Sequence, residues 1–340
     1  MDRNLKIAVA GATGTVGQQI LSALLERGHP SQNVTVLGSE RSEGDEIELG
    51  DDTIVVEKAG PGSFRGIDLA LIATPPEVAS PLALAAQGAG AWVVDTSAAF
   101  RTDPKVPLVL PAVNAADARL PFDGRIVSVP SATTAALATA LEALAPLSPT
   151  DVHVTAMLAA SSAGRAGVDA LEQQTTALLS GREPEGSLFP HRLGFNVIPQ
   201  AGRIASGTAE SEEELGWTRE GDRLGGAIAR AQVSGTAVVV PVFYGHLLCV
   251  TVRLNARPGP DEVRAALKAS PALKVLDDPA ERVYPMPMLV TADAAVHVGR
   301  VRPAIGGEGW FHLLVAVDNA GRGAALNAVE VGELLLARGR

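Results

Sequence analysis

Three regularly spaced glycines are the first feature of this sequence whose residue types could do chemistry. Gly11, Gly14 and Gly17 lie in the stretch GATGTVG, between the apolar run LKIAVA (5–10) and a stretch with helical spacing of its apolar residues. Glycines allow a tight turn and let a pyrophosphate approach the backbone N–H groups at a helix N-terminus. The pattern predicts a dinucleotide-binding loop, and a tight turn that holds no ligand is the alternative.

The stretch after the second predicted strand bears on the type of dinucleotide. It contains Ser39, Arg41 and Ser42, with Glu40 and Glu43 between and after them. An acidic residue at this place favours the ribose hydroxyls of NAD, whereas Arg and Ser can hold the additional phosphate of NADP. We predict NADP, with an ordinary exposed charged loop as the alternative.

Two further side chains are candidates for a reaction site. Arg101 ends the stretch DTSAAFR (95–101), just past a predicted strand, and its guanidinium could bind a phosphate or carboxylate. His246 follows Gly245 at a break in an apolar run, and a histidine there could act as a general acid or base. A surface salt bridge for Arg101 and a structural role for His246 are the alternatives. Cys249 has the opposite strand parity from His246, so we expect a core residue and no nucleophile.

The stretch IVSVPSATTAAL (126–137) has the form of a nucleophile mount. A strand-like IVSV runs into Pro130 and then into a helix, but the stretch contains no cysteine.

Alternating predicted strands and helices must position these residues. Runs that are apolar on both faces and separated by helices predict an α/β fold with a Rossmann-like, doubly wound parallel sheet. From about residue 151 the runs are longer and partly alternating, which predicts a second, α+β domain with a large mixed sheet. We expect the first domain to span 1–131 with a C-terminal helix within 320–340, and the second to span 132–319. The first-domain strands are expected at 5–10, 34–38, 53–57, 68–74, 91–97 and 125–129. Segment 183–216 is expected to be a long surface excursion.

Composition excludes several classes of protein. The chain has 340 residues, 46% of them hydrophobic and 19% charged, which is typical of a folded protein. The formal charge of −10 without a cluster of Lys and Arg argues against a nucleic-acid partner. One cysteine excludes an internal disulfide and a multi-cysteine metal site, and no metal is expected. No apolar run is long enough for a membrane span, so we expect a cytoplasmic protein without a membrane partner.

The motifs together resemble one family over nearly the whole chain, the aspartate-semialdehyde dehydrogenases of amino-acid biosynthesis. The matching stretches are GATGTVG (11–17), SERSEG (39–44), DTSAAFRTDPKVPLVLPAVN (95–114), VPSATT (129–134), SSAG (161–164), EEE (212–214), PVFYGH (241–246), HVGRVR (297–302) and DNAGRGAALNAV (318–329). The family reductively dephosphorylates β-aspartyl phosphate with NADPH. The resemblance implies a homodimer built through the large sheet of the second domain.

The resemblance assigns roles to individual residues. It implies that Arg101 holds the phosphate, Glu214 the substrate amine, and that His246 is the acid/base. It implies cofactor contacts for Gly11, Thr13, Gly14, Thr15, Val16, Gly17, Ser39, Arg41, Ser42, Thr74 and Ser97.

The sequence departs from the family at the reacting groups. The nucleophilic cysteine of the family is replaced by Ala132, its substrate glutamine by Leu158, and its carboxylate-binding arginine by Val239. On the cofactor side, Ala73-Thr74-Pro75-Pro76 replaces a Gly-Gly pair and Glu330 replaces a glutamine, changes that weaken nucleotide binding.

Three hypotheses follow. The first is a pseudoenzyme similar to the cysteine-less Usg-type paralogues, which lacks that activity and binds at most a nucleotide or another small molecule. The second is an active NADP-dependent reductase that acts on a less polar carbonyl substrate, with His246 as acid/base. The third is an active dehydrogenase with Ser131, Thr133 or Thr134 as nucleophile, which would need an adjacent general base.

Overall fold

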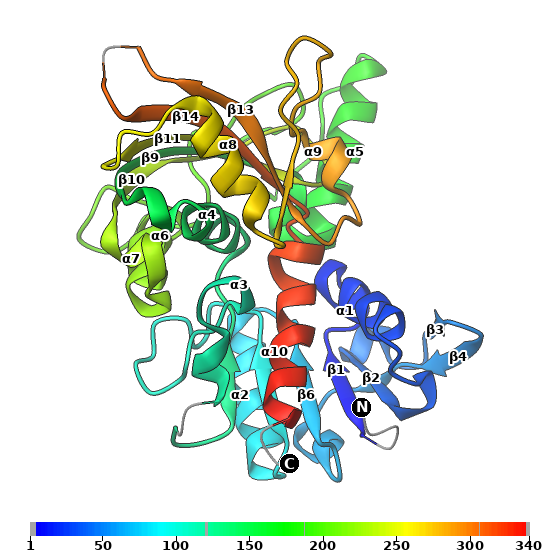
Figure 1. Cartoon of the computed structure of the whole chain (residues 1–340). Coiled ribbons are helices and arrows are strands. Elements are labelled where there is room, and N and C mark those ends of the chain that lie inside the picture. The colour runs from blue at the N-terminus through cyan, green and yellow to red at the C-terminus, as the bar shows by residue number, and fades with distance from the viewer. Residues whose placement is uncertain (1–4, 120–121, 187, 306, 338–340) are drawn as a thin grey trace. The chain divides into compact units, whose positions relative to one another are not determined.

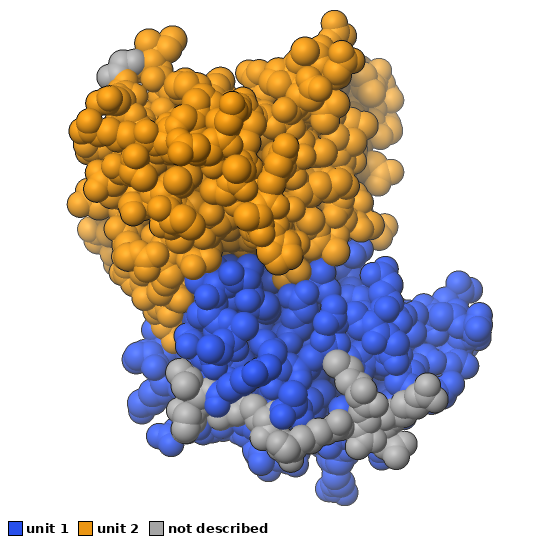
Figure 2. Space-filling model, viewed as in Figure 1, with its two compact units in different colours: residues 1–131, 324–340 blue, residues 132–323 orange. Residues whose placement is uncertain are grey.

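The computed structural model describes residues 5–119, 122–186, 188–305 and 307–337. The chain forms two compact units (Figure 2). Unit 1 comprises Met1–Ser131 and Ala324–Arg340, and unit 2 comprises Ala132–Gly323.

Unit 1 contains a parallel sheet with the strand order β5-β2-β1-β6-β7-β8 (Figure 1). This is the order of a Rossmann-like doubly wound sheet, and it confirms the predicted fold class. Its strands are β1 (Ile7–Ala10), β2 (Val34–Gly38), β5 (Glu57–Lys58), β6 (Leu69–Ile72), β7 (Trp92–Asp95) and β8 (Ile126–Ser128). Its helices are α1 (Thr15–Glu26), α2 (Pro76–Gly88), α3 (Pro111–Asn114) and α10 (Leu326–Leu336).

Helices cover both faces of this sheet because its strands alternate between two apolar cores. Ile7 and Val9 of β1 pack in the core that includes buried residues of α1 and α10. Ala8 and Ala10 of the same strand pack in the core that includes buried residues of α2. Strands buried on both faces have the continuous apolar sequence seen in LKIAVA and DLALIAT.

The strand expected at 53–57 is divided in the structure. Residues Asp52–Val55 form β4, which pairs antiparallel with β3 (Glu46–Leu49) in a separate two-stranded sheet. Val56 then begins the passage into β5, which joins the parallel sheet beside β2. Val55 is exposed and Val56 is buried, so the run TIVVE changes its surroundings halfway along.

Unit 2 contains the predicted mixed sheet. Its strand order is β10-β9-β11-β14-β13-β12. Its outer pairs β10-β9 and β13-β12 are parallel, and the inner pairs are antiparallel. The strands are β9 (Pro149–Leu158), β10 (Gln232–Val239), β11 (His246–Leu254), β12 (Leu273–Val275), β13 (Val296–Pro303) and β14 (Trp310–Val317). The helices are α4 (Ala132–Ala143), α5 (Gly164–Leu179), α6 (Glu212–Leu224), α7 (Gly226–Arg230), α8 (Pro260–Ala269) and α9 (Pro287–Val290).

The segment expected to be an excursion, 183–216, ends earlier than predicted. Helix α6 already begins at Glu212, after Ser211 as its N-cap. Before it, the described residues make two isolated β-bridges, Ile198 with Val239 and Ile204 with Ser211. Within the range 320–340 expected for the C-terminal helix, the structure has a π-helical turn, Gly321–Ala325, and then α10, and residues 338–340 lie outside the described residues.

None of the helices in the described ranges is both long enough and apolar enough to span a membrane.

Candidate functional site

The glycine loop of unit 1 is a close-packed turn between β1 and α1. Gly11 has φ +83°, and a Cβ on it would lie 2.3 Å from the Ala73 carbonyl oxygen. A Cβ on Gly17 would lie 2.1 Å from the carbonyl oxygen of Gly11. These two positions therefore require glycine. Gly14 precedes α1, and no side chain caps this helix end. The first N–H groups of an α-helix have no partner within the helix, so this end of α1 is suited to an anion.

The loop lies where the order of the parallel sheet reverses. β1 has β2 on one side and β6 on the other, so the carboxyl ends of β1 and β6 form the topological switch point at which open α/β sheets bind ligands. Thr74 follows β6, and its methyl group would lie 3.0 Å from a Cβ on Gly11. The Thr74 hydroxyl is buried and has no hydrogen-bond partner among the described residues. A tight backbone cradle and a buried hydroxyl with no partner fit the phosphates of a dinucleotide.

The residues after β2 differ in how far they are available. Ser42 is buried, and its hydroxyl donates to the backbone oxygen of Ser39 at 3.2 Å, within the 3₁₀ turn Glu40–Ser42. The Glu40 carboxylate is 3.1 Å from the ammonium of Lys58. Arg41 is exposed and has no ion pair with any described residue. The guanidinium is therefore the freer charge at the end of β2.

Arg101 is fixed by carbonyl groups near the ends of β7 and β8. Its Nε donates to the Val129 oxygen at 3.1 Å, and its Nη2 donates to the Thr96 oxygen at 2.6 Å. Ser97 donates through N–H and hydroxyl to the buried Asp95 carboxylate, at 3.1 and 2.9 Å. Burial raises the pKa of Asp95, and the hydrogen bonds from Ser97 and the charge of Arg101 oppose this. Arg101 and Ser97 thus belong to one fixed turn, in which the N–H and the hydroxyl of Ser97 both donate hydrogen bonds to Asp95.

Ala132 begins helix α4 in unit 2. Its methyl group is packed so closely that a Cβ on Gly323 would lie 2.7 Å from it. The next residue, Thr133, is buried; its hydroxyl donates to the Glu213 carboxylate and accepts from Trp217 Nε1 at 3.0 Å. Position 132 therefore carries no thiol, and the Thr133 hydroxyl is already bound on both sides.

Glu214, the predicted amine ligand, is part of a capping box. Its Oε2 accepts from the Ser211 N–H at 2.7 Å, and its Oε1 accepts from the Ala237 N–H at 2.9 Å. Burial raises the pKa of Glu214, but these N–H groups outweigh it and hold the pKa below its ordinary value. Oε2 thus stabilises the start of α6, and Oε1 links this helix end to β10. The neighbouring Glu213, absent from our predicted site, is the acid that reaches the start of α4.

His246 shares one cross-strand row with the two apolar replacements. Leu247 of β11 pairs with Met157 of β9, so His246 lies alongside Leu158, and Leu158 pairs directly with Val239 of β10. Neighbours in such a row point to the same face of a sheet. Leu158 and Val239 are 4% and 5% exposed, and His246 is 3% exposed. His246 is therefore bordered by hydrocarbon on the side where the family pattern has a glutamine and an arginine.

A third apolar residue extends this row. Ile198 of the 183–211 segment exchanges both backbone hydrogen bonds with Val239, at 3.0 and 2.9 Å, and is 2% exposed. This contact is not predictable from the sequence, because Ile198 lies in a segment with a loop-like composition.

Burial determines the protonation of His246. It lowers the pKa of the imidazole to about 4, against a smaller opposing effect of the Gly245 backbone. The N–H of Ala159 donates to Nδ1 at 3.2 Å, so the proton of the neutral ring is on Nε2. Near neutral pH, His246 is thus an uncharged hydrogen-bond donor. Cys249 lies on the opposite face, as predicted, but the expectation of a core residue was wrong, because that face is open and Cys249 is only half-buried on it. Burial raises the pKa of its thiol.

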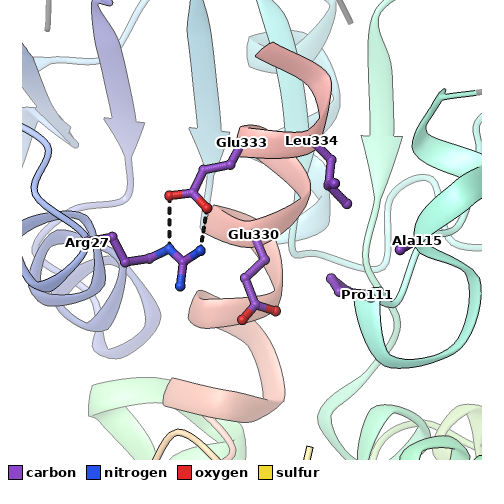
Figure 3. A pocket seen from close by; sticks show the side chains of 6 residues that line it. All are labelled: Arg27, Pro111, Ala115, Glu330, Glu333 and Leu334. Carbon is purple, nitrogen blue, oxygen red and sulfur yellow. Dashed lines mark hydrogen bonds and ion pairs between the residues drawn. The ribbon is translucent and has the colours of Figure 1, made fainter. Parts of the chain in front are cut away.

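Unit 1 has a further hollow of about 390 Å³ away from the glycine loop residues (Figure 3). Arg27 points across it to Glu333 of α10, and the two side chains form a bidentate ion pair. Glu330, which stands where the family pattern has a glutamine, also lines this hollow, with Pro111, Ala115 and Leu334 as its apolar part.

Comparison with known proteins identifies the family. The model for "Semialdehyde dehydrogenase, NAD binding domain" matches residues 6–120, and that for "Semialdehyde dehydrogenase, dimerisation domain" matches residues 140–321. Aspartate-semialdehyde dehydrogenase of Bacillus subtilis is 34% identical, over 98% of both chains. The chain belongs to the aspartate-semialdehyde dehydrogenase family. The crystal structure of aspartate semialdehyde dehydrogenase II of Vibrio cholerae, complexed with ASA, has a TM-score of 0.91 at 31% identity and covers 99% of both chains. A probable aspartate-semialdehyde dehydrogenase of Pseudomonas aeruginosa has a TM-score of 0.90 at 30% identity, again over 99% of both chains.

Family membership makes unit 1 the NAD(P)-binding domain and unit 2 the dimerisation domain. Within unit 1 the structure brings Gly11, Gly17 and Thr74 together, and separately fixes Arg101 beside Ser97. Within unit 2, the part of the aspartate-semialdehyde dehydrogenase fold that carries His246 also contains the Leu158–Val239 pair.

Proposed function

We propose that this chain is an NADP-binding, homodimeric member of its family that does not perform acylating dehydrogenation, in the manner of the Usg-type paralogues. The observation that carries the proposal is the row formed by His246, Leu158 and Val239. A substrate carboxylate that entered this row would lose its water and find hydrocarbon instead of a cation, which is strongly unfavourable.

The start of α4 supports the same conclusion. Thioester formation needs a nucleophile that attacks the acyl carbon, and the methyl group of Ala132 cannot supply one. Thr133 could not replace it without giving up its hydrogen bonds to Glu213 and Trp217, and it is only 1% exposed. We therefore expect no covalent acyl intermediate at this position.

The cofactor half of the proposal rests on unit 1. The N–H groups after Gly14 and the Thr74 hydroxyl would hold the pyrophosphate, and the cofactor would supply hydride chemistry. Arg41 is exposed without an ion pair, whereas Glu40 is engaged by Lys58. The free positive charge after β2 favours the additional phosphate of NADP over NAD.

A titration tests cofactor binding. Purified protein is titrated with NADPH and with NADH, and the quenching of tryptophan fluorescence is followed. We expect tighter binding of NADPH, and at least about tenfold loss of this preference in Arg41→Ala. Arg65→Ala, which removes an exposed arginine after the neighbouring 3₁₀ turn Pro61–Phe64, is the control. If neither nucleotide binds, the proposal that unit 1 binds NADP is refuted.

A second function is supported by the state of His246. A neutral ring with a proton on Nε2, next to Leu158 and in one row with Val239, suits a hydrogen bond to the oxygen of an uncharged carbonyl substrate. Such a reductase would need no thiol, because bound NADPH would supply the hydride and His246 Nε2 would supply the proton that the carbonyl oxygen takes up.

A matched pair of substrates tests this alternative. NADPH oxidation is measured with an uncharged aliphatic aldehyde and with the aldehyde of the same length that ends in a carboxylate. The reductase function predicts turnover of the uncharged compound alone, abolished in His246→Gln. Equal turnover of both aldehydes, or turnover that survives this substitution, would contradict the role of the row.

The homodimer is proposed from unit 2. The face of the mixed sheet that carries Val250, Val252 and Val315 is buried, and α4 contacts β11, β13 and β14. The other face remains partly exposed, and it lies in the region matched as a dimerisation domain. Sedimentation that shows only monomers at micromolar concentration would refute it.

A further inference from the structure

The open face of the mixed sheet is the surface opposite the one that α4 covers. Strand residues alternate between the two faces, so this surface carries the side chains between the buried ones. Met157, Val238, Leu247, Cys249 and Leu314 are half-buried on it. A sheet face of this width with partly exposed apolar side chains suits a second protein surface.

A row of polar side chains crosses this open face from strand to strand. Ser234 pairs with His153, His153 with Thr251, Thr251 with His312, and His312 with Arg302. These five residues, called the histidine row below, come from five different strands and point to the same face. Two histidines thus lie on either side of one threonine, in the middle of the surface.

Each imidazole of the histidine row is held through one ring nitrogen. His153 Nδ1 lies 2.9 Å from the Ser234 hydroxyl, and His312 Nδ1 lies 2.8 Å from the Thr251 hydroxyl. The ring of His153 also stacks on Trp310, with 5.9 Å between centroids and 12° between planes. No described residue forms a hydrogen bond with Nε2 of either histidine. The two rings are fixed in place, and each has one nitrogen available to a partner surface.

The charges around the row do not offset an added positive charge. Arg302 stands at one end of the row, and Lys274 of β12 is paired with Asp293. In the next row, the Asp151 carboxylate is already 3.7 Å from the Arg253 guanidinium. Cys249 lies on the row on the other side, where burial raises the pKa of its thiol, and Arg300 in the bulge of β13 is a further cation. Protonation of both histidines would therefore place three cations in one row without a carboxylate in it.

We propose that the histidine row makes the association of two copies of this chain through the open face dependent on protons, with the dimer favoured when His153 and His312 are neutral. The inference rests on the proposed homodimer and adds a form of regulation to it. Histidine is the side chain that ordinarily changes charge between about pH 5 and 8. Covering protonated rings with a second copy removes water from unpaired charges and places like charges opposite each other, so protonation opposes association.

Sedimentation of the full chain at about pH 8 and about pH 6, at constant ionic strength, tests the inference. We expect the dissociation constant of the dimer to rise at least about tenfold at the lower pH. The double variant His153→Gln, His312→Gln keeps polar side chains but cannot gain protons, and its dissociation constant should change less than about twofold. His191→Gln, in the 183–211 segment, is the control and should keep the full pH dependence.

The outcomes separate the two proposals. A wild-type chain that is monomeric at both pH values refutes the homodimer. A wild-type dimer whose dissociation constant does not change with pH, or a double variant that keeps the wild-type dependence, overturns the role of the histidine row. If the double variant fails to fold or to associate at about pH 8, each single variant must show a weakened dependence, and an unchanged dependence in both overturns the inference.

Discussion

The protonation of His246 gives the sharpest quantitative prediction. The folded chain lowers the pKa of this imidazole from 6.5 to about 4, because burial disfavours its charged form. The unfolded chain therefore binds the proton first as the pH falls. The neutral ring contributes its full stability above pH 6.5, and this stability is lost as the pH falls from there toward about 4.

The magnitude follows from the two pKa values. Between pH 7 and pH 5 the preferential protonation of the unfolded state lowers the free energy of unfolding by about 2 kcal/mol, and by about 3 kcal/mol at pH 4. The ring is fully buried, so solvent screening does not reduce this figure. In His246→Gln this contribution is absent.

Urea unfolding of the wild type and of His246→Gln at several pH values between about 7 and 4.5 measures the difference. Other titrating groups cancel in the comparison, since both chains share them. Between pH 7 and 5 the free energy of unfolding of the wild type should fall by about 2 kcal/mol more than that of the variant. Parallel loss in both chains, or an imidazole NMR titration of His246 near pH 6.5, would refute the buried, neutral ring.

Three substitutions test the remaining geometry. Gly17→Ala places a Cβ 2.1 Å from the Gly11 oxygen. We therefore expect the free energy of unfolding, measured by thermal unfolding, to fall by roughly 1–3 kcal/mol and NADPH binding to be lost. Normal NADPH affinity would contradict the close-packed loop. Thr133→Val leaves the buried Trp217 N–H without its acceptor and should lower the free energy of unfolding by about 1–3 kcal/mol. Thr133→Ser keeps the hydroxyl and should be close to the wild type in stability. Equal loss of stability in the two variants would show that the hydroxyl is not needed. Glu214→Ala should destabilise the protein by about 1 kcal/mol in urea and leave NADPH affinity unchanged, and a variant of wild-type stability would argue against the capping box.

The parallel sheet was predictable because strands buried on both faces have an unmistakable composition. The strands at their centres, IAVA (7–10) and LALI (69–72), are apolar throughout, and alternate residues of each strand pack in different cores. The run TIVVE is also apolar, but Val55 is exposed in a hairpin and Val56 is buried. Nothing in five residues indicates that the chain changes sheets between them.

The start of α6 contained a signal that the prediction did not use. Ser211 followed by Glu214 has the spacing of a capping box, in which the acid at the third helical position turns back to the N-cap. This spacing assigns Glu214 to the helix end and leaves Glu213 to contact Thr133. The three consecutive glutamates, 212–214, can be told apart only when the first residue of the helix is known.

The neighbours of His246 could not be predicted from spacing. Leu158, Ile198 and Val239 are far apart in the sequence, and only the strand register places them in contact. The resemblance to the family indicated that polar residues were missing at two of these positions. It did not show that a third apolar residue packs beside them.

The family reaction itself is the most direct test of the proposed loss of acylating dehydrogenation. Purified protein that binds NADPH is incubated with aspartate semialdehyde, inorganic phosphate and NADP, and reduction of NADP is followed by absorbance. The triple variant Ala132→Cys, Leu158→Gln, Val239→Arg is assayed in parallel, because it restores the family residues at the positions that we hold responsible. We expect no phosphate-dependent reduction of NADP by the wild type and detectable reduction by the triple variant. Phosphate-dependent turnover by the wild type would contradict the proposed loss.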